Sequence, residues 1–249
     1  TRTISSAASD VYKRQDNVMN SQREVIYKKR RNAIIGERLE VDILNTVFDT
    51  CEDIVLTSKQ NENYKDFRLN VLTVLGLDFD KLNEEHFKQK QPEDITRELF
   101  KAVNENYNNK NKSISEAAYP ILKKIKKERG GVVKDILIPF TDGNRQIGVS
   151  VNLDESLENN GENIIKEMQK IVSLGMIDLN WKEHLREMDD LKQSVQSAVY
   201  EQKDPLVIYK FEGFELFKKF IAKVNQDTVS FLTKCLIPIQ NANQVEEAR

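Results

Sequence analysis

The sequence predicts a mainly α-helical, elongated protein that contains one small β-hairpin. Its 249 residues include only 9 glycines and 5 prolines. Sandwiches, barrels and propellers need turn residues about every 8–12 positions, so these counts disfavour an all-β fold. Charged residues make up 31% of the chain and apolar residues 39%. This balance is typical of an extended helical body in which each helix buries a single stripe.

The composition also excludes several classes of protein. Cys51 and Cys235, the only cysteines, are too few for a disulfide framework or a four-cysteine zinc site, and we predict no metal centre. A formal net charge of −2 disfavours a dedicated nucleic-acid binder. No apolar run reaches the roughly 18 residues that span a bilayer, and the first residues lack a signal-peptide core. We therefore expect a cytoplasmic protein and, because the chain starts at Thr1 without methionine, part of a longer one.

The first helix is expected to begin at Asp16. Residues 1–15 are small and polar without clear periodicity, so we interpret them as a tail or as foreign sequence. From Asp16 onward one helical face carries apolar residues, and Gly36 weakens or ends the helix. The basic run 28–31 is either a solvated face or a contact for acidic protein or lipid headgroups.

The next segment predicts several shorter helices. We expect helices over 38–57 and over 64–75, the latter ending at Gly76, which suits a left-handed cap. Further helices are expected from about Asp94 to 107 and over 115–128, separated by a polar loop at 108–112. Pro120 predicts a kink in the last of these.

The sequence pattern changes from helical to β-rich over residues 134–151. Two runs rich in β-branched residues flank Asp142-Gly143, and this is a strong short-range signal for a β-hairpin. An isolated hairpin is marginally stable, so we expect it to pack on helices.

The C-terminal part predicts two long helices that pair as an antiparallel hairpin. The first begins near Glu162, and its apolar seam keeps heptad spacing: Leu174, Ile177, Trp181, His184, Met188, Leu191, Val195 and Ala198. Asp204 and Pro205 suit the start of the second helix. Its expected seam comprises Phe211, Phe214, Phe217, Ile221, Val224, Thr228 and Phe231, with Gly213 as a mild weakness, and residues 239–249 form a polar tail.

The residues alone contain no recognisable catalytic motif. There is no phosphate loop, no metal-protease helix and no nucleophile elbow. We interpret His86 as a surface residue and His184 as a core residue packed near Trp181. Tyr200, in the loop between the long helices, either contacts varied peptide surfaces or packs over its own loop.

Three stretches resemble the SecA family of bacterial protein-translocating motor ATPases. Residues 177–189 (IDLNWKEHLREMD) resemble the family's ID-x-x-WKEHL-x-x-MD helix, and 200–205 (YEQKDP) resemble its finger loop. Residues 16–27 (DNVMNSQREVIY) resemble its scaffold helix, with Asn17 in place of an aspartate. The similarity covers about 16–238 and is weakest between 61 and 128. Residues 1–15 do not match.

The resemblance implies a domain plan and a set of contacts. Residues 16–37 would be scaffold, 38–160 the helical wing with the hairpin 134–151, and 161–238 the returning scaffold and a two-helix finger. The finger tip would contact unfolded preprotein in the mouth of the SecY channel, and Arg23 and Tyr27 would contact scaffold neighbours. The implied tip residues are Tyr200, Glu201, Gln202 and Lys203, and the implied finger core comprises Trp181, His184, Met188, Leu191, Phe211, Phe214 and Phe217.

The family's motor domains, which bind ATP and Mg²⁺, have no counterpart in this sequence, and neither does its zinc tail. The resemblance therefore implies a protein that associates with the inner face of the bacterial plasma membrane, with an anionic membrane surface as a further partner. We expect this chain alone to bind no cofactor and to hydrolyse no ATP. The alternative is a stand-alone helical adaptor or chaperone-like binding module.

Overall fold

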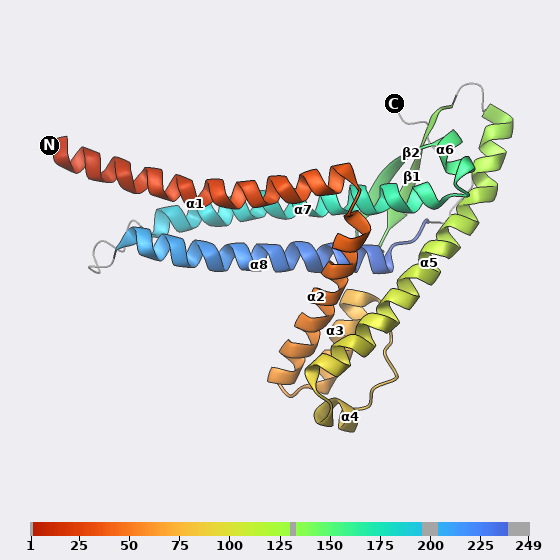
Figure 1. The fold of residues 1–249 in the computed structure, drawn as a ribbon, viewed down its shortest axis with the longest axis horizontal. Helices are drawn as coiled ribbons and strands as arrows, with labels where there is room; N and C mark the ends of the chain where they lie inside the picture. Colours follow the sequence, from red (N-terminus) through yellow and green to blue (C-terminus); the bar gives the residue numbers. More distant parts are fainter. Residues whose placement is uncertain (1, 130–132, 196–203, 239–249) are drawn as a thin grey trace. The chain divides into compact units, whose positions relative to one another are not determined.

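The computed structural model describes residues 2–129, 133–195 and 204–238, and the side chains of 15–128, 133–195 and 204–238. Helices dominate, and the described residues contain one two-stranded antiparallel sheet, so the predicted fold class is confirmed (Figure 1). The chain divides into two compact units. We call Thr1–Glu37 with Leu174–Val224 the bundle, and Arg38–Ser173 with Asn225–Arg249 the second unit. The domain limits expected from the sequence stay a prediction.

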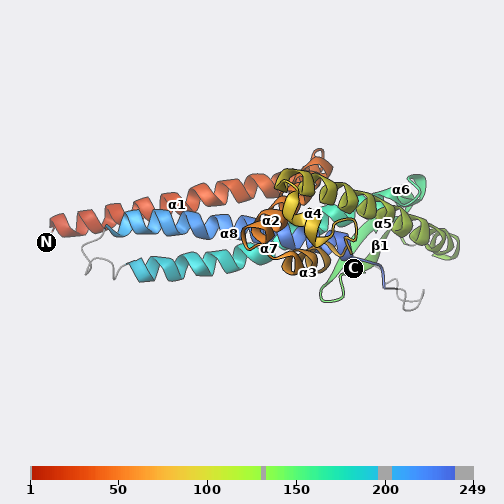
Figure 2. The same cartoon turned by 90° about the horizontal axis from the view of Figure 1, so that it is seen from below.

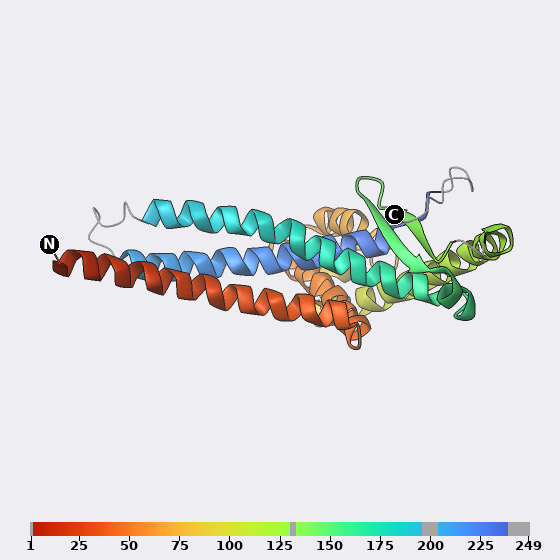
Figure 3. The ribbon, with the colours of Figure 1, turned by 90° about the horizontal axis from the view of Figure 1, so that it is seen from above.

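The bundle consists of three helical segments that run side by side. They come from α1 (Arg2–Ile35), α7 (Glu162–Ser194) and α8 (Pro205–Lys234), and their adjacency is seen in Figure 2 and Figure 3. Helix α1 ends before Gly36, whose φ of 78° is left-handed, as predicted. At its other end α1 starts at Arg2, so the prediction that this helix begins at Asp16 is wrong, and the interpretation of 1–15 as a tail or foreign sequence stays a prediction. Residues without an apolar stripe still have adequate helix propensity.

The start of α8 is fixed by local chemistry. The backbone N–H of Leu206 donates to the Asp204 carboxylate at 2.8 Å. Pro205, the first helical residue, lacks an N–H that would need a partner there. The predicted cap is confirmed, and it sets where the second arm of the hairpin begins.

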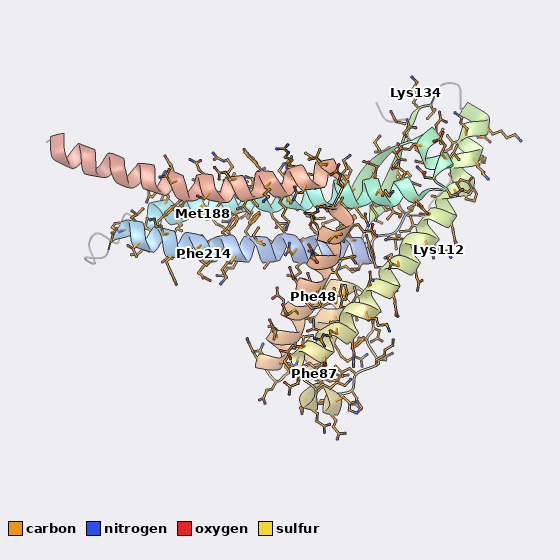
Figure 4. The ribbon with its side chains drawn as sticks, viewed as in Figure 1. Phe48, Phe87, Lys112, Lys134, Met188 and Phe214 are labelled. Atoms are coloured by element: carbon orange, nitrogen blue, oxygen red, sulfur yellow. The ribbon has the colours of Figure 1, made fainter. Side chains whose placement is uncertain are left out.

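The second unit begins with α2 (Leu39–Gln60), α3 (Tyr64–Leu75) and α4 (Glu84–Gln89). Helix α3 has the predicted bounds, and its cap Gly76 has a φ of 64°. The Phe67 and Phe87 rings lie 4.9 Å apart in the core of this unit, and Phe48 meets Phe100 at 5.5 Å (Figure 4). The sequence prediction missed the short helix α4, which Asn83 caps by accepting the His86 N–H at 2.8 Å.

Helix α5 (Pro92–Arg129) is continuous, so the predicted loop at 108–112 is wrong. Its buried residues Val103, Tyr107 and Ile114 continue one stripe across the polar run. Lys110 also finds a partner, because its Nζ donates to the Thr233 carbonyl at 2.8 Å. Polarity alone is therefore a poor sign of a loop when helical spacing is kept.

The predicted β-hairpin is confirmed, with β1 (Asp135–Thr141) paired to β2 (Gln146–Asn152) in antiparallel register. Asp142 shapes the turn by accepting the backbone N–H groups of Asn144 at 3.0 Å and Arg145 at 2.7 Å. Arg145 also pairs with Asp227 at 3.3 Å, which fastens the turn to α8. A short helix, α6 (Leu153–Glu158), follows β2 and was not predicted.

The described residues offer neither a membrane-spanning helix nor a cluster of metal ligands. No helix among them is long and apolar enough to cross a membrane. Nor does this part of the chain bring together three or more side chains that could hold a metal ion.

Candidate functional site: the helical hairpin and its polar layer

The α7 arm of the hairpin buries the seam that the sequence predicts. Ile177, His184, Met188, Leu191 and Val195 are buried, and Trp181 is half-buried against them. Leu174 is also half-buried, and Ala198 lies outside the described residues. The heptad spacing on α7 therefore identified the correct inward face.

The α8 arm buries only part of the predicted seam: Val224, Thr228 and Phe231 are buried, and Ile221 is half-buried. Phe211 is 68% exposed and Phe214 is 58% exposed, so their prediction as finger core is wrong. Phe217 is half-buried and remains in contact with the core. The buried positions in the bundle part of α8 are Leu206, Tyr209, Gly213, Phe220 and Val224. This stripe also has near-heptad spacing, and it shares Val224 with the predicted seam.

Gly213 lies at a close contact between α8 and α7. A methyl group built at Gly213 would lie 3.0 Å from the Met188 methyl carbon, so a side chain here would force the end of Met188 to move. The residue that the sequence marks as a weakness is thus a contact point. Met188 packs with Leu191, Val195 and Tyr209 in the apolar cluster on one side of it.

A buried polar layer separates that cluster from a second one. The second cluster contains Ile26, Ile177, Phe220 and Val224. Between the two, the Gln22 amide donates to the Gly213 carbonyl at 3.0 Å, and the Gln22 carbonyl oxygen lies 2.9 Å from His184 Nε2. The layer therefore joins α1, α7 and α8 through one carboxamide.

The geometry fixes the proton on His184. A backbone carbonyl only accepts, so Gln22 must turn its NH₂ group to Gly213 and its oxygen to His184. The imidazole must then donate through Nε2–H, which leaves Nδ1 as a bare lone pair. That atom is buried and has no hydrogen-bond partner among the described residues, and the nearest carboxylate, Glu187, is 3.9 Å away.

Aromatic rings enclose the imidazole. Its centroid is 4.9 Å from Phe220, 5.4 Å from Trp181 and 5.7 Å from Phe217. His184 is 1% exposed, and this burial lowers its pKa from 6.5 to about 4. The histidine is therefore neutral near pH 7, and it is a core residue as the sequence predicts. No nucleophile contacts it, so the layer is suited to holding helices together.

The tip of the hairpin cannot be compared with its prediction. Tyr200, Glu201, Gln202 and Lys203 lie outside the described residues. Beside the tip, α8 displays a stripe of exposed apolar side chains. Its members are Val207, Phe211 and Phe214.

The scaffold residues predicted on α1 point outward. Tyr27 is 59% exposed, and Arg23 is exposed with its guanidinium donating to Asn20 at 3.3 Å. Their surfaces are available to a partner, and the contact itself stays a prediction. The inward side of α1 is tied to α7 by ion pairs at both ends, Asp16 with Lys192 and Arg30 with Asp178.

Sequence reasoning missed the roles of Gln22 and Gly213. Gln22 shares the apolar face with Ile26, and Gly213 interrupts an otherwise bulky helix. A polar residue and a glycine in heptad positions are signals of a polar layer and a close helix contact. Their pairing across 191 residues of sequence is not visible in the pattern.

Comparison with known proteins agrees with this architecture. Residues 12–236 match the family model described as SecA Wing and Scaffold domain. The chain is 47% identical to the protein translocase subunit SecA of Cytophaga hutchinsonii over 234 residues, which is 94% of this chain and 21% of that protein. It is 44% identical to the SecA of Christiangramia forsetii, with the same coverage, and 41% identical to that of Porphyromonas gingivalis W83 over 93% of the chain.

The chain thus spans about a fifth (21%) of the length of these relatives. The matched region holds the bundle's polar layer and most of the second unit. Since the family model covers most of the chain, the chain belongs to the SecA wing and scaffold domain family.

Proposed function

We propose that this chain is the scaffold, wing and finger portion of an ATP-driven protein translocase. In this role it couples motion of the motor to an unfolded preprotein through the α7–α8 hairpin. Its partners are the SecY channel, the preprotein and the motor domains of the same protein. The whole protein works in the cytoplasm at the inner face of the plasma membrane, where an anionic surface is a further partner.

One observation carries the proposal. Two of the sequence stretches that resemble the translocase, 16–27 and 177–189, meet in the bundle through the bond between Gln22 and His184. Residues far apart in the chain are thus brought into the same polar layer. The family relation to translocase subunits extends over both stretches.

The form of the hairpin supports a mechanical role. Each arm has a closely packed inner face, and the polar layer anchors both arms to α1. A packed bundle of helices transmits displacement with little deformation because protein interiors have low compressibility. The exposed stripe at Val207, Phe211 and Phe214 gives this lever an apolar surface close to its tip.

Tyr200 should contact the moving chain. A photo-crosslinking amino acid at Tyr200 in the complete translocase is expected to capture a stalled preprotein or the channel. The same probe at Glu183, an exposed position in the middle of α7, should capture far less. Absence of crosslinks from every position in 200–203 would rule out the finger role.

Tyr200→Ala in the complete translocase is expected to slow preprotein transport at least tenfold, with ATP binding changed much less. Removing the ring removes a large contact that adapts to varied peptide surfaces. Tyr200→Phe keeps the ring and should retain most of the transport activity. Both variants would be compared by transport into membrane vesicles and by nucleotide affinity. Equal transport by Tyr200→Ala and the parent protein would contradict the proposal.

The isolated chain is expected to hydrolyse no ATP, because its sequence contains no phosphate-binding loop. In the whole protein, ATP and Mg²⁺ would be held by the motor domains. The measurement is phosphate release by purified chain, with and without Mg²⁺. Turnover that co-elutes with the pure chain would show that this region has a nucleotide site of its own.

A further inference from the structure

The inward face of α1 alternates between apolar and polar residues. Met19, Ile26 and Ala33 recur every seven residues along it, and Ile26 and Ala33 are buried. A second row has the same spacing and is polar: Gln15, Gln22 and Lys29. Gln15 is 3% exposed, and its Oε1 has no hydrogen-bond partner among the described residues.

The contacts of α1 with α7 share one antiparallel register. Asp16 meets Lys192, Gln22 meets His184, and Arg30 meets Asp178. A residue that lies n positions further toward the C-terminus of α1 therefore contacts a residue about n positions nearer the N-terminus of α7. In this register Gln15 comes level with Leu191, one heptad beyond His184.

Apolar packing alone specifies this register weakly. A shift of α1 by one heptad, roughly 10 Å along the axis, places Met19 where Ile26 was and Ile26 where Ala33 was. After such a shift, apolar side chains of α1 still occupy apolar positions in the bundle. A directional hydrogen bond inside an apolar bundle does not survive the shift, which is how a single buried polar residue fixes the register of a coiled coil.

We propose that Gln22 is a register pin, a positioning residue that selects one axial placement of α1 against the α7–α8 hairpin. The pin uses both ends of the carboxamide, one on His184 and one on Gly213. The inference concerns the bundle and holds whether or not the hairpin touches a preprotein. When the pin is lost, one competing placement is favoured, the one that brings Gln15 opposite His184.

The direction of that shift follows from the residues on either side of Gln22. Gln15 carries the same carboxamide and can replace Gln22 opposite the neutral imidazole. Lys29, one heptad the other way, would bring a cation against it.

The test is disulfide formation in the full chain between paired cysteines. The pair Arg30→Cys and Asp178→Cys reports the native register, and Arg23→Cys with Asp178→Cys reports the register shifted by one heptad. Asp178 is replaced in both pairs, so the Arg30–Asp178 ion pair cannot bias the comparison. The native cysteines, Cys51 and Cys235, are buried, and peptide mass spectrometry identifies the linked pair.

With Gln22 present, only the native pair should crosslink efficiently. Gln22→Met fills the same space without polar atoms, and it should retain or raise the melting temperature while the shifted pair gains roughly tenfold, the effect of losing about 1.4 kcal/mol of preference. The double variant Gln15→Met, Gln22→Met should lose this gain. Gln169→Met is the matched control, because Gln169 is a buried glutamine bonded to Tyr107 in the second unit.

An unchanged crosslinking pattern in folded Gln22→Met would overturn the proposal, since an ordinary buried glutamine affects stability without affecting register. Should Gln22→Met fail to fold, Gln22→Leu removes the same carboxamide while keeping His184, and it should release the same shifted crosslink. Native-only crosslinking in folded Gln22→Leu would likewise count against the pin.

Discussion

Phe220→Ala is expected to lower the free energy of unfolding of the bundle by about 3–5 kcal/mol, the range for deleting a buried phenyl ring. Phe220 is 4% exposed, and its ring lies against those of His184, Trp181 and Phe217. The neighbouring rings hold one another in place and cannot move far into the space that Phe220 leaves. The remaining cavity therefore costs free energy in addition to the lost burial of the ring.

The measurement is chemical denaturation followed by Trp181 fluorescence and by circular dichroism. Trp181 is the only tryptophan of the chain and lies 5.5 Å from Phe220, so its signal reports on the bundle. Phe214→Ala is the matched control, the same change on the same helix at a residue that is 58% exposed, and it should cost no more than about 0.5 kcal/mol. Equal losses in both variants would mean that α8 does not bury the stripe described here.

Acidification from pH 7 to pH 5 is expected to cost the bundle about 2 kcal/mol through His184 alone. Burial lowers the pKa of His184 from 6.5 to about 4. The unfolded chain therefore takes up a proton as the pH falls below 6.5, and the folded chain does so only near 4. Stability from the neutral imidazole is complete above the unfolded pKa and is lost progressively between pH 6.5 and pH 4.

His184→Gln removes the titrating group, so its stability should depend less steeply on pH over this range. Confining denaturation measurements to pH 5–7 keeps the protonation of ordinary carboxyl groups small. The control is His86→Gln, at an exposed histidine of the second unit, which should leave the bundle's pH dependence intact. A slope that persists in His184→Gln would assign the effect to another group.

The sequence predicted well those elements whose ends carry specific chemistry. Helix α3 runs over the expected residues because Gly76 supplies a left-handed cap, and the Asp142-Gly143 turn placed the hairpin. The α7 seam was also correct, since only one of its faces is apolar. In each case the local sequence was compatible with only one structure.

Predictions failed where tertiary contacts choose between local alternatives. In the first half of α8 apolar residues lie on two adjacent stripes, and packing against α7 and α1 buries the one that contains Tyr209. The polar run in α5 remains helical because the buried stripe of Val103, Tyr107 and Ile114 continues across it. The Gln22–His184 layer was missed for the same reason, because its partners come from distant parts of the chain.

The half-polar inner face of α1 has a consequence for synthesis on the ribosome. Helix α1 is made first, and its bundle partners come only after residues 38–173 have been added. At about 5–20 residues per second this delay is on the order of ten seconds. A fully apolar face exposed for that time would invite aggregation, whereas Gln15, Gln22 and Lys29 interrupt the face and keep the nascent helix compatible with water until its partners emerge.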